Sequence, residues 1–239
     1  VDGNAVKPDL DDEGQLLEGK EQTIAKTWRI DIRDDLQWTY HPDTIQQFPD
    51  LADTPEITAE DFVETYKMAI EEGWFRAISG GGDFFSSSQK IVNAEKFYEG
   101  KADWTDVGIK LIDATEGNSG SIEFTFENKM SEWNVRYWLG SFVMGPIDRD
   151  LYDALEPANE SEVNPYGTTV AYTAYNGPFR LDTYQPDKLV SYVKNDNYSR
   201  KDDYKFTHWN YAVIEDAEVR WQEFLDGHLD AASVPSTAY

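Results

Sequence analysis

Alternation of apolar and polar residues predicts strands in the first half of the chain. In residues 25–38, Trp28, Ile30 and Ile32 alternate with charged residues, as in a half-buried strand. Residues 107–128 show the same alternation of apolar and polar residues on both sides of a glycine-containing segment, 116–120. That pattern predicts a hairpin whose turn lies in this segment.

A second hairpin is predicted in residues 175–202. Two alternating runs flank Pro186, whose fixed φ suits the second position of a type I turn. Residues 206–214 predict one more strand, and residues 228–234, with the sequence HLDAASV, resemble another. Residues 39–56 contain three prolines and several acids, so we expect a long loop there.

Helical periodicity is clearest after Thr58. Thr58 is a candidate N-cap with Asp61 three residues later, and apolar residues then recur on one face as far as Gly73. Further helices are predicted in residues 89–98, 131–142 and 216–227. Hairpins and helices together indicate an α+β fold, a mixed sheet with helices.

The composition adds a strong acidic bias. The 239 residues carry a net charge of −25, and they include 8 Trp, 14 Tyr and 12 Phe, enough aromatic residues for a substantial core. A solvated acidic surface is the simplest interpretation, and attraction of cationic ligands is a second one. So acidic a surface repels nucleic acid, which we therefore do not expect as a partner.

Candidate catalytic and metal-binding residues are missing from the sequence. The chain has no cysteine, its three histidines are far apart, and no Gly-x-Ser-x-Gly motif is present. The glycine triplet at 80–82 lacks the Lys and Ser/Thr of a phosphate loop. We therefore expect no catalytic residue, no metal and no cofactor. Carboxylate pairs among 46 acidic residues leave open one alternative of another class, a glycan-processing enzyme with an acidic cleft.

Several aromatic residues stand close to the glycine-rich segment or to each other along the chain. Most aromatic residues belong to a core, but as a group these are also candidates for lining an apolar cleft. The group comprises Phe84, Phe85, Trp133, Tyr137, Trp138 and Phe142.

Motifs in a fixed order resemble one known family. WRIDIRDDLQW followed by ITAEDFVETYKMAI resembles the "LRdglkW … vTAeDFvyswkr" signature of the peptide and nickel class of extracellular solute-binding proteins. YNGPFRLDTYQPDKLVSYVKNDNY is similar to "NGpy.l..w.p...i.l.KNpnYwd", and EVRWQEFLDGHLDAASVP to "a.e.FkdGelDaa.ip". The chain is most similar to the oligopeptide-binding lipoproteins of Gram-positive ABC importers. It departs from the family in a longer loop after Trp38 and in Asp196 and Ser199, which replace the Pro and Trp of "KNpnYw".

The resemblance implies a fold and a domain organisation. Family members have two lobes, so the chain is expected to be a truncated first lobe of a two-lobed periplasmic-binding-protein-like fold. Residues 1–40 and 151–239 would belong to a sheet-bearing subdomain, with 41–150 inserted as a second subdomain. The second lobe would be absent.

The resemblance also implies a function. The protein would be the substrate-binding component of an ABC importer, a monomer that captures oligopeptides outside the cell and passes them to a membrane permease. The full-length form would be lipid-anchored at the cell surface. It would not be an enzyme. Within the same fold, the ligand is alternatively a dipeptide, a nickel chelate, an oligosaccharide or a signalling peptide.

Peptide sites recognise the main chain by hydrogen bonds and hold side chains in roomy pockets. Asn176 would offer its amide to a peptide bond, although Asn before Gly is equally typical of a turn. The sequence predicts these ligand-binding residues: Tyr175, Asn176 and Gly177 at the start of the second hairpin, Phe84 and Phe85 on the glycine-rich segment, and Trp138, Phe142 and Met144.

Overall fold

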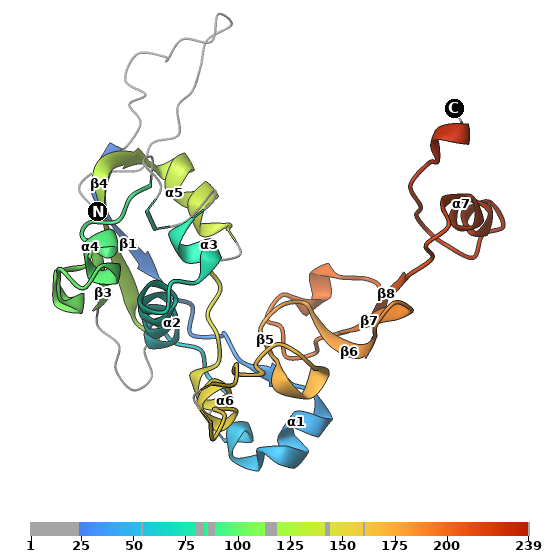
Figure 1. Cartoon of the computed structure of the whole chain (residues 1–239), viewed down its shortest axis with the longest axis horizontal. Coiled ribbons are helices and arrows are strands. Elements are labelled where there is room, and N and C mark those ends of the chain that lie inside the picture. Colours follow the sequence, from blue (N-terminus) through green and yellow to red (C-terminus); the bar gives the residue numbers. More distant parts are fainter. Residues whose placement is uncertain are drawn as a thin grey trace, which may run out of the picture. The chain divides into compact units, whose positions relative to one another are not determined.

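The computed structural model describes residues 24–53, 55–79, 84–85, 89–112, 119–141, 144–159 and 161–238. Their contacts divide the chain into two compact units. The first unit comprises residues up to Leu36 together with Glu56–Asp153, and the second comprises Gln37–Pro55 and Ala154–Tyr239. Mixed sheets and helices confirm the predicted α+β class (Figure 1).

The first unit is built on a three-stranded antiparallel sheet with the order β1-β4-β3. Its strands are β1 (Ile24–Asp31), β3 (Ile109–Ile112) and β4 (Ser121–Ser131). Phe124 in the central strand lies opposite Trp28 of β1 and Ile109 of β3. The predicted strand thus ends at Asp31, and the predicted hairpin 107–128 is confirmed, with residues 113–118 of its turn outside the described ranges.

Helix α2 (Ala59–Glu71) begins as its sequence predicts. The Thr58 hydroxyl accepts a hydrogen bond from Glu60 N, and the Asp61 carboxylate accepts one from Thr58 N at 2.7 Å, which completes a capping box. Burial raises the pKa of Asp61, although the bonds from Thr58 lower it. Since Gly73 has a φ of +67°, it ends the helix in a conformation that glycine adopts without strain.

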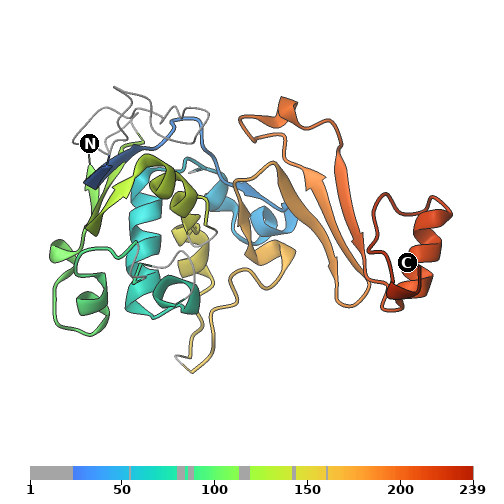
Figure 2. The same cartoon turned by 90° about the horizontal axis from the view of Figure 1, so that it is seen from above.

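The core of the first unit is aromatic. Trp138 packs edge-on against Phe124 and Phe126, with ring centroids 5.1 Å away in both cases, and against Phe84 at 6.0 Å. Tyr66 of α2 contacts Phe84 and Phe124 and donates its hydroxyl to Met144 O at 2.8 Å. Figure 2 shows α2 beside the strands that supply these rings.

The remaining elements of the first unit are short. They are α3 (Phe75–Ile78), α4 (Ala94–Tyr98), a 3-10 turn at Trp104–Asp106, α5 (Glu132–Leu139) and α6 (Arg149–Ala154). The helix predicted in 89–98 is confirmed only for its second half, because Asn93 takes a left-handed φ of 58° that interrupts helical geometry. The helix predicted in 131–142 is confirmed as α5.

The second unit contains two small antiparallel sheets. One pairs β2 (Thr39–Tyr40) with β5 (Ala174–Tyr175), and the other has the order β6-β7-β8. The strands of the larger sheet are β6 (Phe179–Gln185), β7 (Leu189–Lys194) and β8 (His208–Ala212). The predicted hairpin 175–202 and the strand in 206–214 are therefore confirmed.

The loop predicted for residues 39–56 is wrong. This segment contains β2, α1 (Pro42–Gln47) and a 3-10 helix, Pro49–Ala52. Pro42 and Pro49 each stand at a helix start, where the missing N–H costs nothing, and His41 Nδ1 accepts from Asp43 N as an N-cap. The prolines initiate helices here rather than excluding them.

Two details of the C-terminal half also need correction. Asp187 has a φ of +60° at the third turn position, which rules out the type I turn predicted at Pro186 and is typical of a type II turn. Helix α7 (Ala217–Leu225) begins as predicted, with Asp216 accepting from Glu218 N and Val219 N.

The strand predicted in 228–234 is wrong, since this segment pairs with no strand among the described residues. Short 3-10 turns complete this unit at Val170–Tyr172, Lys201–Asp203 and Ser236–Ala238.

The two units do not follow the predicted division into 1–40, 41–150 and 151–239, because pairing with β4 groups β1 with residues 56–153. The predicted division describes subdomains of a complete two-lobed protein, and it stays a prediction.

The capping box of α2 gives a first testable prediction. Replacing Thr58 with Ala removes the hydroxyl that accepts from the helix N-terminus, and we expect the free energy of unfolding to fall by about 1 kcal/mol. Urea unfolding followed by circular dichroism measures it. Thr58→Ser keeps the oxygen and is the matched control. Equal stability of the Ala and Ser variants would contradict a capping role.

Candidate functional site

The residues Tyr175, Asn176 and Gly177 connect β5 to β6. Tyr175 pairs with Thr39 of β2, and Gly177 precedes Pro178 at the start of the β6–β7 hairpin. All three residues are half-buried. They form a short, half-buried edge between the two strands, and their predicted role in binding stays a prediction.

Asn195 holds this edge in place. Its side chain is 2% exposed, and Nδ2 donates to Gly177 O at 2.9 Å while its backbone N–H donates to Pro178 O at 2.9 Å. The Asn195 Oδ1 accepts from Thr39 Oγ1 at 3.1 Å and from Asn197 N at 3.0 Å. One buried amide therefore ties β2, the start of β6 and the end of β7 together.

Two buried polar atoms near this edge make no hydrogen bond of good geometry within the described part of the chain. They are the hydroxyl oxygen of Tyr175 and Nη1 of Arg180, which lies 3.6 Å from Asp182 Oδ1 in a looser ion pair. Burial raises the pKa of Tyr175, and a loose contact with the Thr173 side chain and the nearby positive charge of Arg180 lower it to a smaller extent. Buried polar groups are normally bonded, so these two atoms are candidates for contact with water or ligand.

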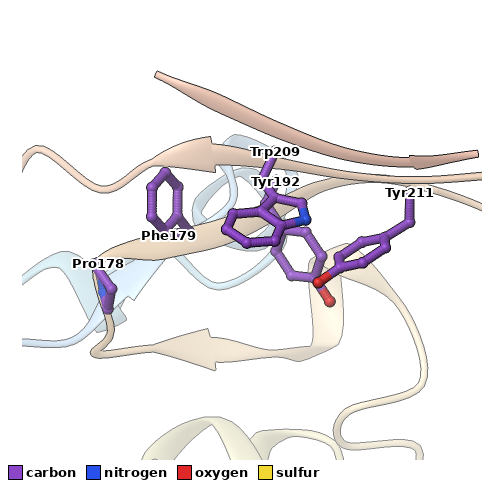
Figure 3. A pocket seen from close by; sticks show the side chains of 5 residues that line it. All are labelled: Pro178, Phe179, Tyr192, Trp209 and Tyr211. Carbon is purple, nitrogen blue, oxygen red and sulfur yellow. The ribbon is translucent and has the colours of Figure 1, made fainter. Parts of the chain in front are cut away.

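An aromatic pocket lies on the same sheet. It has a volume of about 250 Å³ and is lined by Pro178, Phe179, Tyr192, Trp209 and Tyr211 (Figure 3). Tyr192 lies opposite Trp209 in the β7–β8 pairing, so the two rings share one face. The sequence reasoning missed this pocket and Arg180. The alternation of Trp209 and Tyr211 in a predicted strand was the only available signal.

The other predicted site residues lie in the first unit. Phe84, Trp138 and Met144 are 0%, 1% and 4% exposed and belong to its core. Phe85 is partly buried and packs on Tyr98 with ring centroids 5.8 Å apart. Core packing accounts for Phe84, Met144 and the ring of Trp138, whose indole N–H is also without a hydrogen-bond partner among the described residues. The predicted role of the three residues in binding stays a prediction. Phe142 lies outside the described residues.

No group of three or more His, Cys, Asp or Glu in the described part of the chain is placed to hold a metal ion. Burial raises the pKa of the Asp61 carboxyl group, and that carboxylate is engaged in capping α2. Within the same ranges, no helix combines the length and apolar character needed to cross a bilayer.

Comparisons with protein families, with curated proteins and with solved structures all point to bacterial solute-binding proteins. The profile of the family described as bacterial extracellular solute-binding proteins, family 5 Middle, matches residues 8–239. The oligopeptide-binding protein SarA of Streptococcus gordonii is 24% identical over 90% of this chain, and the dipeptide-binding protein DppE of Bacillus subtilis is 26% identical over 90%. A periplasmic oligopeptide-binding protein of Borrelia burgdorferi covers 96% of the chain with a TM-score of 0.66 and 21% identity, so the fold is of this kind.

The chain spans about a third of the length of the two curated relatives. The aligned shares are 30% of SarA, 35% of DppE and 41% of the Borrelia chain. The match therefore concerns one part of a larger fold, as the resemblance of the motifs implied.

Trp138 provides a prediction that separates core from ligand contact. Trp138→Ala should lower the free energy of unfolding by about 3–5 kcal/mol, because it empties the centre of the aromatic core. Trp133→Ala, on the same helix but 66% exposed, should change it by less than about 0.5 kcal/mol. Denaturant unfolding measures both variants. Similar effects of the two substitutions would contradict the core assignment of Trp138.

Asn195 gives another prediction. Asn195→Ala removes three side-chain hydrogen bonds and leaves the part-buried Gly177 carbonyl without its donor, so we expect the free energy of unfolding to fall by about 3 kcal/mol. Hydrogen exchange should accelerate in residues 174–179. Asn176→Ala, which leaves these bonds intact, is the control. Unchanged exchange in the Asn195 variant would show that the edge is held by other contacts.

Proposed function

Because this chain belongs to the bacterial extracellular solute-binding proteins of family 5, we propose that it is part of the substrate-binding component of an ABC importer. The complete protein captures oligopeptides outside the cell and delivers them to a membrane permease. It acts by binding and carries no catalytic function. Its full-length form is a lipid-anchored monomer on the outer face of the membrane.

The names of the relatives support a peptide ligand. SarA is an oligopeptide-binding protein and DppE a dipeptide-binding protein, and the chain is about equally similar to both. Their identities of 24% and 26% leave peptide length open, so a dipeptide is the nearest alternative ligand. The motifs leave nickel chelates, oligosaccharides and signalling peptides as further alternatives within the family.

The observation that carries the proposal is the pair of buried polar atoms beside the Tyr175–Gly177 edge. A hydroxyl group can donate to a peptide carbonyl, and a guanidinium can bind a carboxylate. Contact with a peptide main chain would satisfy both Tyr175 Oη and Arg180 Nη1 without fixing the side chains of the ligand. Broad peptide recognition needs this kind of contact.

The chain contributes only one wall of such a site. By resemblance to the family, ligand is enclosed between two lobes that close by hinge motion. Closure removes water from the ligand and adds contacts from the second lobe, so half of the site should bind with severely reduced affinity. The predicted residues Tyr175, Asn176 and Gly177 would act from this wall.

A glycan-processing enzyme is the alternative of another class. It needs two carboxyl groups facing each other across a cleft, one of them with a raised pKa. The carboxyl group of Asp61 has a raised pKa, but its bonds to Thr58 fix it at a helix start. The relatives named here carry the names of binding proteins. Both observations favour binding over hydrolysis.

The function is tested on the full-length protein. Mass spectrometry of the purified protein identifies ligands that co-purify, and a peptide library screened by calorimetry measures affinity and length preference. We expect peptides to be recovered and to bind. Recovery of a sugar or a metal chelate, with no peptide bound from the library, would contradict the proposed ligand.

Tyr175 gives the sharpest mutational prediction. Tyr175→Phe in the full-length protein removes only the buried hydroxyl, and we expect peptide affinity to weaken about tenfold, or by about 1.4 kcal/mol. Isothermal calorimetry measures it. Trp133→Ala, exposed and in the other unit, is the control and should bind like the unaltered protein. An unchanged affinity of Tyr175→Phe would remove this hydroxyl from the binding site.

A further inference from the structure

Asn176 and Gly177 form the chain's only Asn-Gly sequence. This pair is chemically labile, because the backbone nitrogen of the glycine can attack the side-chain amide carbon of the asparagine, and glycine has no Cβ to hinder the approach. Apart from its chain neighbours, a Cβ built on Gly177 would meet only Phe179 O, at 4.0 Å. Among the described residues, the Gly177 N–H donates no hydrogen bond. The described part of the chain therefore neither crowds nor bonds the attacking nitrogen.

The fold nevertheless restrains the rotation about the Asn176 backbone that ring closure needs. On one side, Tyr175 belongs to β5 and pairs with β2. On the other side, Asn195 donates its side-chain N–H to Gly177 O and its backbone N–H to Pro178 O, both at 2.9 Å. Pro178 adds a fixed φ. Moving Gly177 N toward Asn176 Cγ would therefore strain or break these bonds.

We propose that Asn176 is a site of intramolecular deamidation, and that Asn195 preserves its amide by holding the Gly177 and Pro178 carbonyls. In the reaction, a bond forms between Gly177 N and Asn176 Cγ, the Cγ–Nδ2 bond breaks, and ammonia leaves with the proton of the Gly177 N–H. Water then opens the cyclic imide at either of its carbonyls, which yields aspartate or isoaspartate at position 176. Solvent water is the only co-reactant.

The product changes the candidate site in two ways. The amide of Asn176 offers N–H donors, whereas a carboxylate only accepts hydrogen bonds and carries a negative charge, so it repels the carbonyl groups of a peptide main chain. Isoaspartate also adds a methylene group to the backbone, which displaces Gly177 O from Asn195. Deamidation would therefore weaken peptide capture by this wall. This consequence, unlike the chemistry, rests on the proposed function.

Ageing of the full-length protein tests the chemistry. Folded protein, and the same protein unfolded in urea, are incubated in mildly alkaline buffer, and mass spectrometry quantifies aspartate and isoaspartate at position 176. We expect the folded protein to react at least about tenfold more slowly, since the reaction requires local opening of the edge. Equal rates in the two states, or no reaction in either, would overturn the proposal.

Gly177→Ala tests the intramolecular route. The structure has room for the added methyl group, and that group hinders the attack by the backbone nitrogen. We expect this variant to form little product even when it is unfolded in urea. A yield equal to that of the unaltered protein would show that water attacks the amide directly, and would overturn the route through the imide.

Asn195→Asp isolates the contribution of Asn195. The aspartate keeps an oxygen acceptor for its other partners but cannot donate to Gly177 O. We expect deamidation of the folded variant to be about fivefold to tenfold faster, because the loss of one hydrogen bond raises the population of the open edge. Ser191→Ala removes the 2.6 Å bond to Asn210 in the same sheet and should react like the unaltered protein. An unchanged rate in Asn195→Asp, or equal acceleration in Ser191→Ala, would overturn the role of Asn195.

Calorimetry on the full-length protein separates this inference from the proposed function. Asn176→Asp reproduces one product and should weaken binding of the best peptide from the library at least about tenfold. Asn134→Asp, which adds the same charge at an exposed position of α5, should bind like the unaltered protein. Equal affinities of Asn176→Asp and the unaltered protein would overturn the effect on binding and leave the proposed function standing. Failure of the unaltered protein to bind any peptide would refute the proposed function, and the ageing rates would still decide the chemistry.

Discussion

The buried amide of Asn195 is the contact on which the candidate site depends. It joins Thr39, Gly177 and Asn197, which come from three segments of the second unit, through hydrogen bonds of 2.9–3.1 Å. A side chain that is 2% exposed cannot exchange these partners for water, so breaking one bond leaves a buried polar group unsatisfied. The chain therefore holds the Tyr175–Gly177 edge in one conformation before any ligand arrives, which lowers the entropic cost of binding.

Aromatic residues serve opposite purposes in the two units. In the first unit they fill the core around Trp138, and Phe84 and Tyr66 complete it from other elements. In the second unit, rings on β6, β7 and β8 line an open pocket and leave a sheet face exposed. Residue type does not distinguish these cases. What separates buried rings from exposed rings is the number of layers packed against each sheet. Helix α2 covers the first sheet, whereas α7 buries none of its residues.

The family membership and the site geometry support one interpretation. A binding protein needs a rigid scaffold, a few unsatisfied polar groups and an apolar surface, and it needs no catalytic constellation. The first unit supplies rigidity through its aromatic core and capped helix. In the proposed site, the second would supply the Tyr175 hydroxyl and the Arg180 guanidinium. The net charge of −25 on the whole chain disfavours anionic partners.

The sequence by itself determined the features that are local in the chain. Thr58 and Asp216 marked helix starts, period-two alternation marked both hairpins, and ordered motifs identified the family, because caps, alternation and motifs act within a few residues. It failed where distant segments decide the structure. The unpaired segment 228–234 contradicted its local pattern. The helices in residues 39–56 were missed for a different reason, because their local signals, Pro42, Pro49 and the His41 cap, were interpreted as loop residues. Only the tertiary structure placed Phe84 and Trp138 inside a core, left Trp209 exposed and buried Asn195 against Gly177, since burial depends on which residues far apart in the chain pack together.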